Sequence, residues 1–201
     1  LRNRSGELTE LNSLSGWNIL PNDELLIEVA VQNRGITAST PATMTITHPD
    51  GLTSSHPLPS LASYEAHKVN FTWTVPSDQA IGTVPVSWQA DPEGINTADA
   101  NSTNDQALIS MFVGRLPTPV FTDSNAMTLE PLLLSANESF DEDGGTVSCE
   151  FKIPYDDGTR NWAWETVPSQ SCAVSWTWMD DGNYPVEITV TDEEKDEQTA
   201  I

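Results

Sequence analysis

Apolar side chains at every second position are the feature of this 201-residue chain that most restricts its fold. Period-two alternation is typical of a strand with one buried face, whereas the spacing typical of amphipathic helices is almost absent. The alternating segments are short and are separated by turns rich in Gly, Pro and Asp; in the first half they lie at 25–31, 44–46, 69–75, 84–88 and 109–113. This pattern predicts an all-β chain made of two immunoglobulin-like β-sandwiches in tandem.

A proline-bearing segment divides the alternating segments into two groups. The stretch "VGRLPTPVF" (113–121) interrupts the alternation with two prolines, which is typical of a short, stiff linker. We therefore predict a first sandwich at 1–114, a linker at 115–119 and a second sandwich at 120–201. In the second sandwich we expect strands at 126–134, 147–153, 161–166, 173–178 and 184–191, and "DEQTAI" (196–201) as the beginning of another. We also expect the chain to be a piece of a longer protein.

The chain is strongly acidic, with 30 Asp and Glu residues against 8 Lys and Arg and a formal net charge of −22. This charge argues against nucleic acid and anionic membrane surfaces as partners, because both attract Lys and Arg. No apolar run approaches the ~20 residues of a membrane span, so we expect no direct membrane insertion. A strong negative charge of this kind is most simply explained by solubility in a salty medium. The excess is greatest after the linker, where residues 116–201 carry 18 acids and 3 bases.

Both halves resemble families of surface modules. The hairpin "VSWTWMDDGNYPVEITVTD" (174–192), the turn "SFDEDGGTVS" (139–148) and "YDDG" (155–158) make the second half similar to PKD domains, an immunoglobulin-like family. The first half resembles CARDB domains, the adhesion-related modules of bacterial and archaeal surface proteins, in three stretches: "LLIEVAVQNRGITAS" (25–39), "VNFTWTVP" (69–76) and "VSWQADPEGINTADANSTND" (86–105). These resemblances imply extracellular, non-catalytic sandwiches.

The turn at 141–143 places three carboxylates side by side, so it is either a solvated turn or a site for a hard cation. Calcium accepts six to eight oxygen ligands with flexible geometry, which suits carboxylates and turn carbonyls. The PKD resemblance implies Ca²⁺ held by Asp141 and Asp192, with Asp143 as a further candidate ligand. We interpret the rest of the run "DEEKDE" (192–197) as a solvated face.

Two cysteines, Cys149 and Cys172, both lie on predicted strands of the second half. They could be buried free thiols, but an even count in a surface-type chain favours a disulfide between them. Four Asn-x-Ser/Thr sequons fit a secreted chain, at Asn3, Asn70, Asn101 and Asn137.

Trp162 and Trp164 are candidates for an exposed aromatic platform that binds carbohydrate, with packing inside the sandwich as the alternative. The PKD resemblance implies that Trp178 takes the place of a core Tyr, and the spacing of two puts Trp176 on its face.

No set of residues predicts catalysis. The three histidines, His48, His56 and His67, have no evident Ser or Cys partner and are expected to be exposed, and no phosphate-binding loop or zinc-protease motif occurs. We therefore predict a non-catalytic extracellular structural or adhesive module, a spacer or stalk of a larger cell-surface or secreted protein. Its partners would be neighbouring domains of the same chain and a surface glycan or protein. The alternative is a carbohydrate-binding accessory module of a secreted hydrolase.

Overall fold

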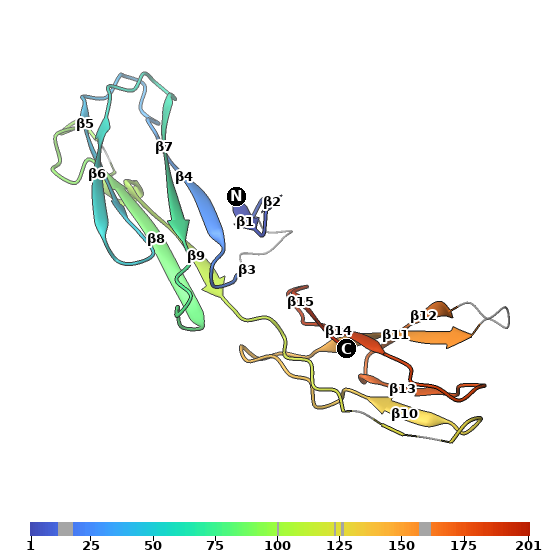
Figure 1. The fold of residues 1–201 in the computed structure, drawn as a ribbon. Coiled ribbons are helices and arrows are strands. Elements are labelled where there is room, and N and C mark those ends of the chain that lie inside the picture. The colour runs from blue at the N-terminus through green and yellow to red at the C-terminus, as the bar shows by residue number, and fades with distance from the viewer. Residues whose placement is uncertain (12–17, 100, 123, 126, 157–161) are drawn as a thin grey trace. The chain divides into compact units, whose positions relative to one another are not determined.

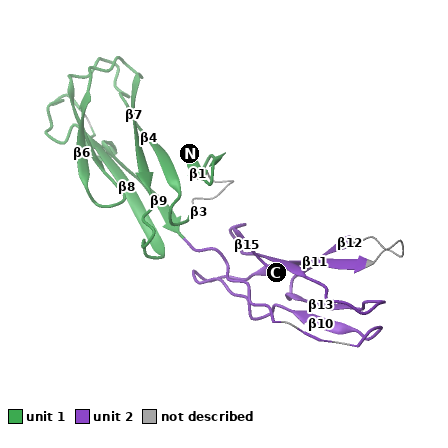
Figure 2. Cartoon of the chain, in the orientation of Figure 1, with its two compact units in different colours: residues 1–113 green, residues 114–201 purple. Residues whose placement is uncertain are grey.

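The chain forms strands at the alternating segments, as the computed structural model shows for residues 1–11, 18–99, 101–122, 124–125, 127–156 and 162–201. It divides between Val113 and Gly114 into two units, which Figure 2 shows in different colours. Among the residues described, no helix is long and apolar enough to cross a membrane. The prediction of all-β, immunoglobulin-like sandwiches is therefore confirmed.

The first unit is a sandwich of two sheets (Figure 1). Its elements are β1 Arg2–Arg4, β2 Glu7–Thr9, β3 Asn18–Ile19, β4 Glu24–Gln32, β5 Ala42–Thr47, β6 Thr53–Leu58, β7 Ala66–Thr74, β8 Gly82–Ala90, the short 3-10 helix η1 Ser102–Asn104, and β9 Gln106–Val113. One sheet has the order β2-β1-β4-β7 and the other the order β3-β9-β8-β5-β6. The pairing is antiparallel except between β3 and β9, which run parallel.

The core of the first unit lies between these sheets and uses the alternating positions of the sequence. On β4 the side chains of Leu25, Ile27 and Val29 are buried while the residues between them are exposed. The other sheet contributes buried residues such as Met44 and Val86. Half-buried aromatic side chains of β7 pack against this cluster. The predicted inward faces of these strands are therefore correct, since alternation alone determines which face meets the other sheet.

The second unit also contains two antiparallel sheets. Its strands are β10 Leu132–Ser135, β11 Ser148–Asp156, β12 Trp162–Ser169, β13 Ala173–Trp176, β14 Glu187–Thr191 and β15 Glu197–Ala200. β10 pairs with β13, and the other strands form a sheet in the order β12-β11-β14-β15. The core contains the fully buried Phe151, Ile153, Ile188 and Val190.

The disulfide expected between Cys149 and Cys172 is present in the second unit. Cys149 lies on β11 of the four-stranded sheet, and Cys172 directly precedes β13 of the two-stranded sheet. Both residues are buried in the core of the unit. The bridge therefore links the two sheets through the apolar interior.

The proline-bearing segment after Val113 belongs to the second unit. The backbone N–H of Thr118 donates to the carbonyl of Phe140 at 2.7 Å, and the N–H of Phe140 returns a bond to Thr118 at 3.1 Å. The N–H of Val120 donates to the Ser139 hydroxyl oxygen at 2.9 Å. Residues 118–120 therefore pair with the segment that begins the acidic turn.

Candidate metal centre

The acidic turn at 141–145 is held by contacts with other segments of the second unit. Its N-terminal side follows the pairing of Phe140 with Thr118. At its centre, the Asp143 Oδ2 atom accepts a hydrogen bond from the backbone N–H of Arg115 at 2.8 Å. Gly144 and Gly145 have φ angles of 101° and 94°, which side chains rarely tolerate, and the Glu193 carboxyl lies against Gly145. The three consecutive acids therefore stand on a fixed turn.

A second acidic turn joins β14 to β15. The backbone N–H of Asp196 donates to the Asp192 Oδ1 atom at 2.8 Å, and the N–H of Asp192 donates to the carbonyl of Asp196 at 3.2 Å. Lys195 has a left-handed φ of 73°, which closes the turn. Asp192 and Asp196 are buried, with exposed fractions of 5% and 7%. Our interpretation of "DEEKDE" as a solvated face is therefore wrong for Asp196, because this carboxylate-capped turn folds it inward.

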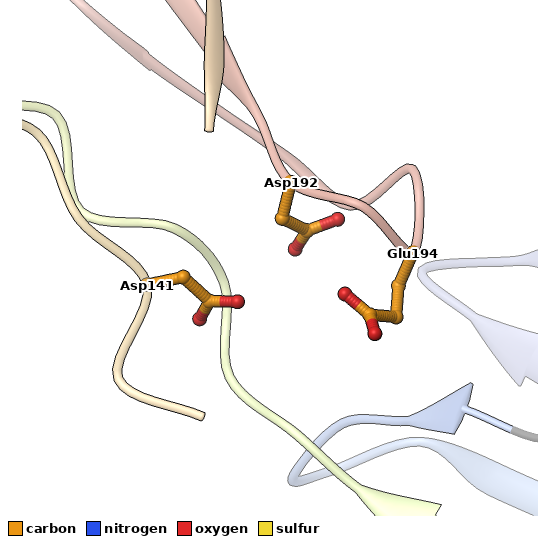
Figure 3. A group of neighbouring side chains, drawn as sticks. All are labelled: Asp141, Asp192 and Glu194. Carbon is orange, nitrogen blue, oxygen red and sulfur yellow. The ribbon is translucent and has the colours of Figure 1, made fainter. Parts of the chain in front are cut away.

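The two turns bring three carboxylates together, as Figure 3 shows. Asp141, Asp192 and Glu194 each offer an oxygen that lies within 4.8 Å of the others. Two further atoms are buried without a hydrogen-bond partner, Asp141 Oδ2 and Asp143 Oδ1. Asp143 lies next to Asp141, since its backbone N–H donates to Asp141 Oδ1 at 3.3 Å. Unpaired buried carboxylate oxygens are costly, so the arrangement favours a positive partner.

The environment of these carboxylates disfavours their ionised forms. Burial, the adjacent Asp143 carboxyl and the charge of Asp192 together raise the pKa of Asp141 to about 7, although the hydrogen bond from the Asp143 backbone lowers it. Burial also raises the pKa of Asp192, and the charges of Asp196, Glu194 and Asp143 raise it further, while the hydrogen bond from the Asp196 backbone lowers it. A cation among them would remove the repulsion and return both groups to their ionised forms.

The geometry fits one hard cation. Calcium binds oxygen at 2.3–2.6 Å, so ligands on opposite sides of one ion lie about 4.6–5.2 Å apart. The separations of at most 4.8 Å between the three carboxylates fall within that limit. These acids are less suited to glycoside hydrolysis, which places its two carboxyl groups about 5–5.5 Å or about 6.5–9.5 Å apart. The separations between the three carboxylates are therefore compatible with a shared ion.

The sequence identified part of this cluster. Asp141 and Asp192 do lie together. Asp143 is adjacent to Asp141, but its Oδ2 atom is engaged by Arg115. Glu194 was missed, although its position two residues after a strand-end Asp in a predicted hairpin turn was a signal that it could point back.

The tryptophans divide between core and surface. Trp164 is exposed, and the Lys152 ammonium lies 5.2 Å from the centre of its ring. The side chain of Trp162 lies outside the described part of the chain. Trp178 is half-buried, donates to the carbonyl of Pro154 at 2.7 Å and contacts the half-buried Trp176, with ring centres 6.5 Å apart. The inward positions expected for Trp176 and Trp178 therefore agree with the structure.

Two histidines have a serine partner that the sequence analysis did not find. The Nε2 atoms of His48 and His56 lie 2.7 Å and 2.8 Å from the Ser54 hydroxyl oxygen. All three residues are half-buried, and so is His67, so the expectation of exposed histidines is wrong. A Ser–His pair can form a nucleophile and base. In the described residues, however, no carboxylate is hydrogen-bonded to either ring to orient it.

The sequons lie on or near the surface of their units. Asn70, Asn101 and Asn137 are exposed. Asn3 is half-buried, and its side-chain amide donates to Glu24 Oε2 at 3.3 Å. Glycosylation of any of the four stays a prediction.

Comparison with known proteins identifies the first unit. Among solved structures, the chain is similar to the CARDB domain of a Pyrococcus furiosus protein crystallised in complex with di-metal ions. The two share 20% identity over 48% of this chain and 79% of that one, with a TM-score of 0.42. No curated protein matches the chain. The family model described as CARDB matches residues 7–107. The chain therefore belongs to the CARDB family.

Proposed function

We propose that this chain is a non-catalytic structural and adhesive module of a cell-surface or secreted protein, in which a CARDB sandwich is followed by a PKD-like sandwich that binds Ca²⁺. CARDB modules are of the cell-surface, adhesion type, and the family is not enzymatic. The disulfide fits an oxidising, extracellular compartment. The output of such a module is mechanical, since it holds neighbouring domains of its own chain in place.

The observation that carries the proposal is the convergence of Asp141, Asp192 and Glu194. The first of these stands on the turn after Phe140, and the other two stand on the hairpin between β14 and β15. A cation bound by all three would therefore cross-link the beginning of the second unit to its last hairpin. Because the Thr118–Phe140 pairing ties the same turn to the segment after Val113, the ion would also fix that segment against the sandwich.

Calorimetric titration with Ca²⁺ tests the site. We expect one ion per chain and a higher melting temperature for the second unit, since binding at 100 times the Kd stabilises by about 2.7 kcal/mol. Asp192→Asn keeps the oxygen that accepts from Asp196 but removes a charge, so it should abolish the response. Glu142→Gln is the matched control, because this neighbouring acid is exposed and outside the cluster. Equal melting temperatures in Ca²⁺ and in chelator would contradict the site.

Single-molecule stretching tests the mechanical role. The second unit should unfold at higher force in Ca²⁺ than in chelator, and the Asp192→Asn variant should unfold at the lower force in both. Reductant should lengthen its unfolded contour by about 80 Å, because the disulfide shields 23 residues that extend by about 3.3–3.6 Å each. If the wild-type chain and the Asp192→Asn variant unfold at the same force in Ca²⁺, the ion does not resist mechanical load.

The second candidate function is carbohydrate binding, and the exposed ring of Trp164 favours it. Trp164 has an exposed fraction of 47%, and the nearby Lys152 could hydrogen-bond sugar hydroxyls. Pull-down on insoluble polysaccharides, with Trp164→Ala as the test, distinguishes the two functions. Phe140→Ala is a suitable control, since this aromatic ring is also 47% exposed in the same unit. Polysaccharide binding that is lost only with Trp164 would favour the accessory-module function over the spacer.

A further inference from the structure

We propose that the first unit contains a separate site for a transition-metal cation such as Zn²⁺, Ni²⁺ or Cu²⁺, formed by His48 and His56. The Nε2 atoms of the two rings converge on one point, the Ser54 hydroxyl oxygen, at 2.7 Å and 2.8 Å. The proposal is independent of the Ca²⁺ site, which lies in the other unit and uses only oxygen ligands.

The hairpin β5–β6 places the three side chains together. Its register pairs Ile46 with Ser54 and Met44 with His56, and paired residues share one face of a sheet. Ile46 and Met44 are buried in the core, so Ser54 and His56 also face the interior of the sandwich. His48 follows Ile46 by two residues and continues the same face, after which the turn closes at Gly51 with a φ of 80°.

This group lies beside the edge strands of the two sheets. β6 is the last strand of the five-stranded sheet, and β7 is the last strand of the four-stranded sheet. The His48 ring meets Phe71 of β7 edge to face, with ring centres 4.5 Å apart and an angle of 80°. The opposite sheet thus contacts the His48 ring, and the three side chains of the site are half-buried.

To accept an ion, the two rings would turn from the hydroxyl oxygen toward a shared point beside it, because the position of that oxygen itself is blocked by the Ser54 Cβ to which it is bonded. Zinc would lie at about 2.0–2.1 Å from each imidazole nitrogen there. The Ser54 hydroxyl would rotate to another staggered position. Water and this hydroxyl could then complete the coordination. The hydroxyl can donate to one ring and accept from the N–H of the other, whereas an ion accepts a lone pair from both rings.

The chemistry of the ligands selects the cation. Imidazole nitrogen suits Zn²⁺, Cu²⁺ and Ni²⁺, while Ca²⁺ and Mg²⁺ prefer oxygen. The two ion sites of the chain should therefore respond to different metals. Excess Mg²⁺ can occupy surface carboxylates during a titration without competing for the histidines.

The test is calorimetric titration of the whole chain with Ni²⁺ in excess Mg²⁺, together with electron paramagnetic resonance of bound Cu²⁺. We expect one tight site whose Cu²⁺ spectrum carries hyperfine splitting from two nitrogens. His48→Gln and His56→Gln can keep a hydrogen bond to Ser54 but remove a ligand. Each should weaken Ni²⁺ binding by at least about tenfold, because even the loss of outer-shell partners of metal ligands has an effect of that size.

Two controls separate ligation from folding. His67→Gln changes the remaining histidine, which lies on β7, and should leave Ni²⁺ affinity unchanged. Ser54→Ala removes the shared hydroxyl and should retain the site, because the nitrogens supply the binding. A Cu²⁺ spectrum with oxygen ligands only, or equal Ni²⁺ affinity in the wild-type chain and both His→Gln variants, would overturn the proposal. Loss of the site with His67→Gln in a folded chain would also overturn it.

Discussion

Removal of the Cys149–Cys172 disulfide should destabilise the second unit and leave the first unchanged. The bridge closes a loop with a sequence separation of 23 and ties β11 of one sheet to the residue before β13 of the other. The chain-entropy model gives about 3.4 kcal/mol for a loop of this length at 25 °C. The perturbation is the double substitution Cys149→Ala with Cys172→Ala, which leaves no thiol to pair elsewhere.

Differential scanning calorimetry measures the size of the effect. One kcal/mol shifts the melting temperature of a domain of 60–100 residues by about 4–8 °C, so we expect the transition of the second unit to fall by about 15–25 °C. The first unit contains no cysteine and serves as an internal control whose transition should not move. A fall of less than about 5 °C, which corresponds to roughly 1 kcal/mol, would refute the entropic argument.

Hydrogen exchange shows where the stability is lost. In the part of the chain that the structure describes, β10 and β13 pair only with each other over four residues, and such two-stranded pairs are marginal on their own. Their amides should lose more protection than those of β11 and β14, which lie inside the four-stranded sheet. Equal loss of protection in both sheets would mean that the bridge stabilises the unit as a whole and does not anchor the smaller sheet.

The remaining predictions concern buried polar groups. In chelator, the folded second unit holds a proton on Asp141 between its ordinary pKa of 3.8 and its raised value of about 7. Its melting temperature should therefore fall as pH rises through that window, and Asp141→Asn or millimolar Ca²⁺ should flatten the profile. Asp23 is buried and accepts two bonds of 2.9 Å from Arg4, so Arg4→Met should destabilise the first unit by about 3–5 kcal/mol in denaturant titration, with the loss reduced in Arg4→Met, Asp23→Asn, which removes the charge but keeps an acceptor for the Leu20 N–H. Asn33 donates to the carbonyls of Thr37 and Leu61, and Asn33→Ala should cost about 2–3 kcal/mol by the same measurement, against little change for Gln106→Ala at an exposed position.

The strand faces could be predicted because they depend on local pattern. Leu25, Ile27 and Val29 show the alternation without knowledge of their partners, and all three are buried. β6 was not predicted, since "TSSHPL" has a single large apolar residue and its inner face is half-buried. An edge strand does not need a continuous apolar face, so its sequence carries little periodic signal. The contact of Ser54 with two histidines follows from the β5–β6 register, which the alternation of one strand does not specify.

The ion cluster depends on backbone turns that alternation cannot describe. Asp141 and Asp192 were paired only through a family resemblance, because the chain between them contains most of the second unit. Their approach requires β11 and β14 to be neighbours, with Ser148 opposite Thr191, so that the turns at the ends of these strands meet. Glu194 joins them because the left-handed backbone at Lys195 and the bond from Asp196 to Asp192 close the hairpin tightly. The acidity of the second half therefore has a structural consequence beyond solubility. Three of its carboxylates, on Asp141, Asp192 and Glu194, lie close together. Burial and the neighbouring negative charges raise the pKa of Asp141, so a proton or a cation at this cluster relieves the repulsion.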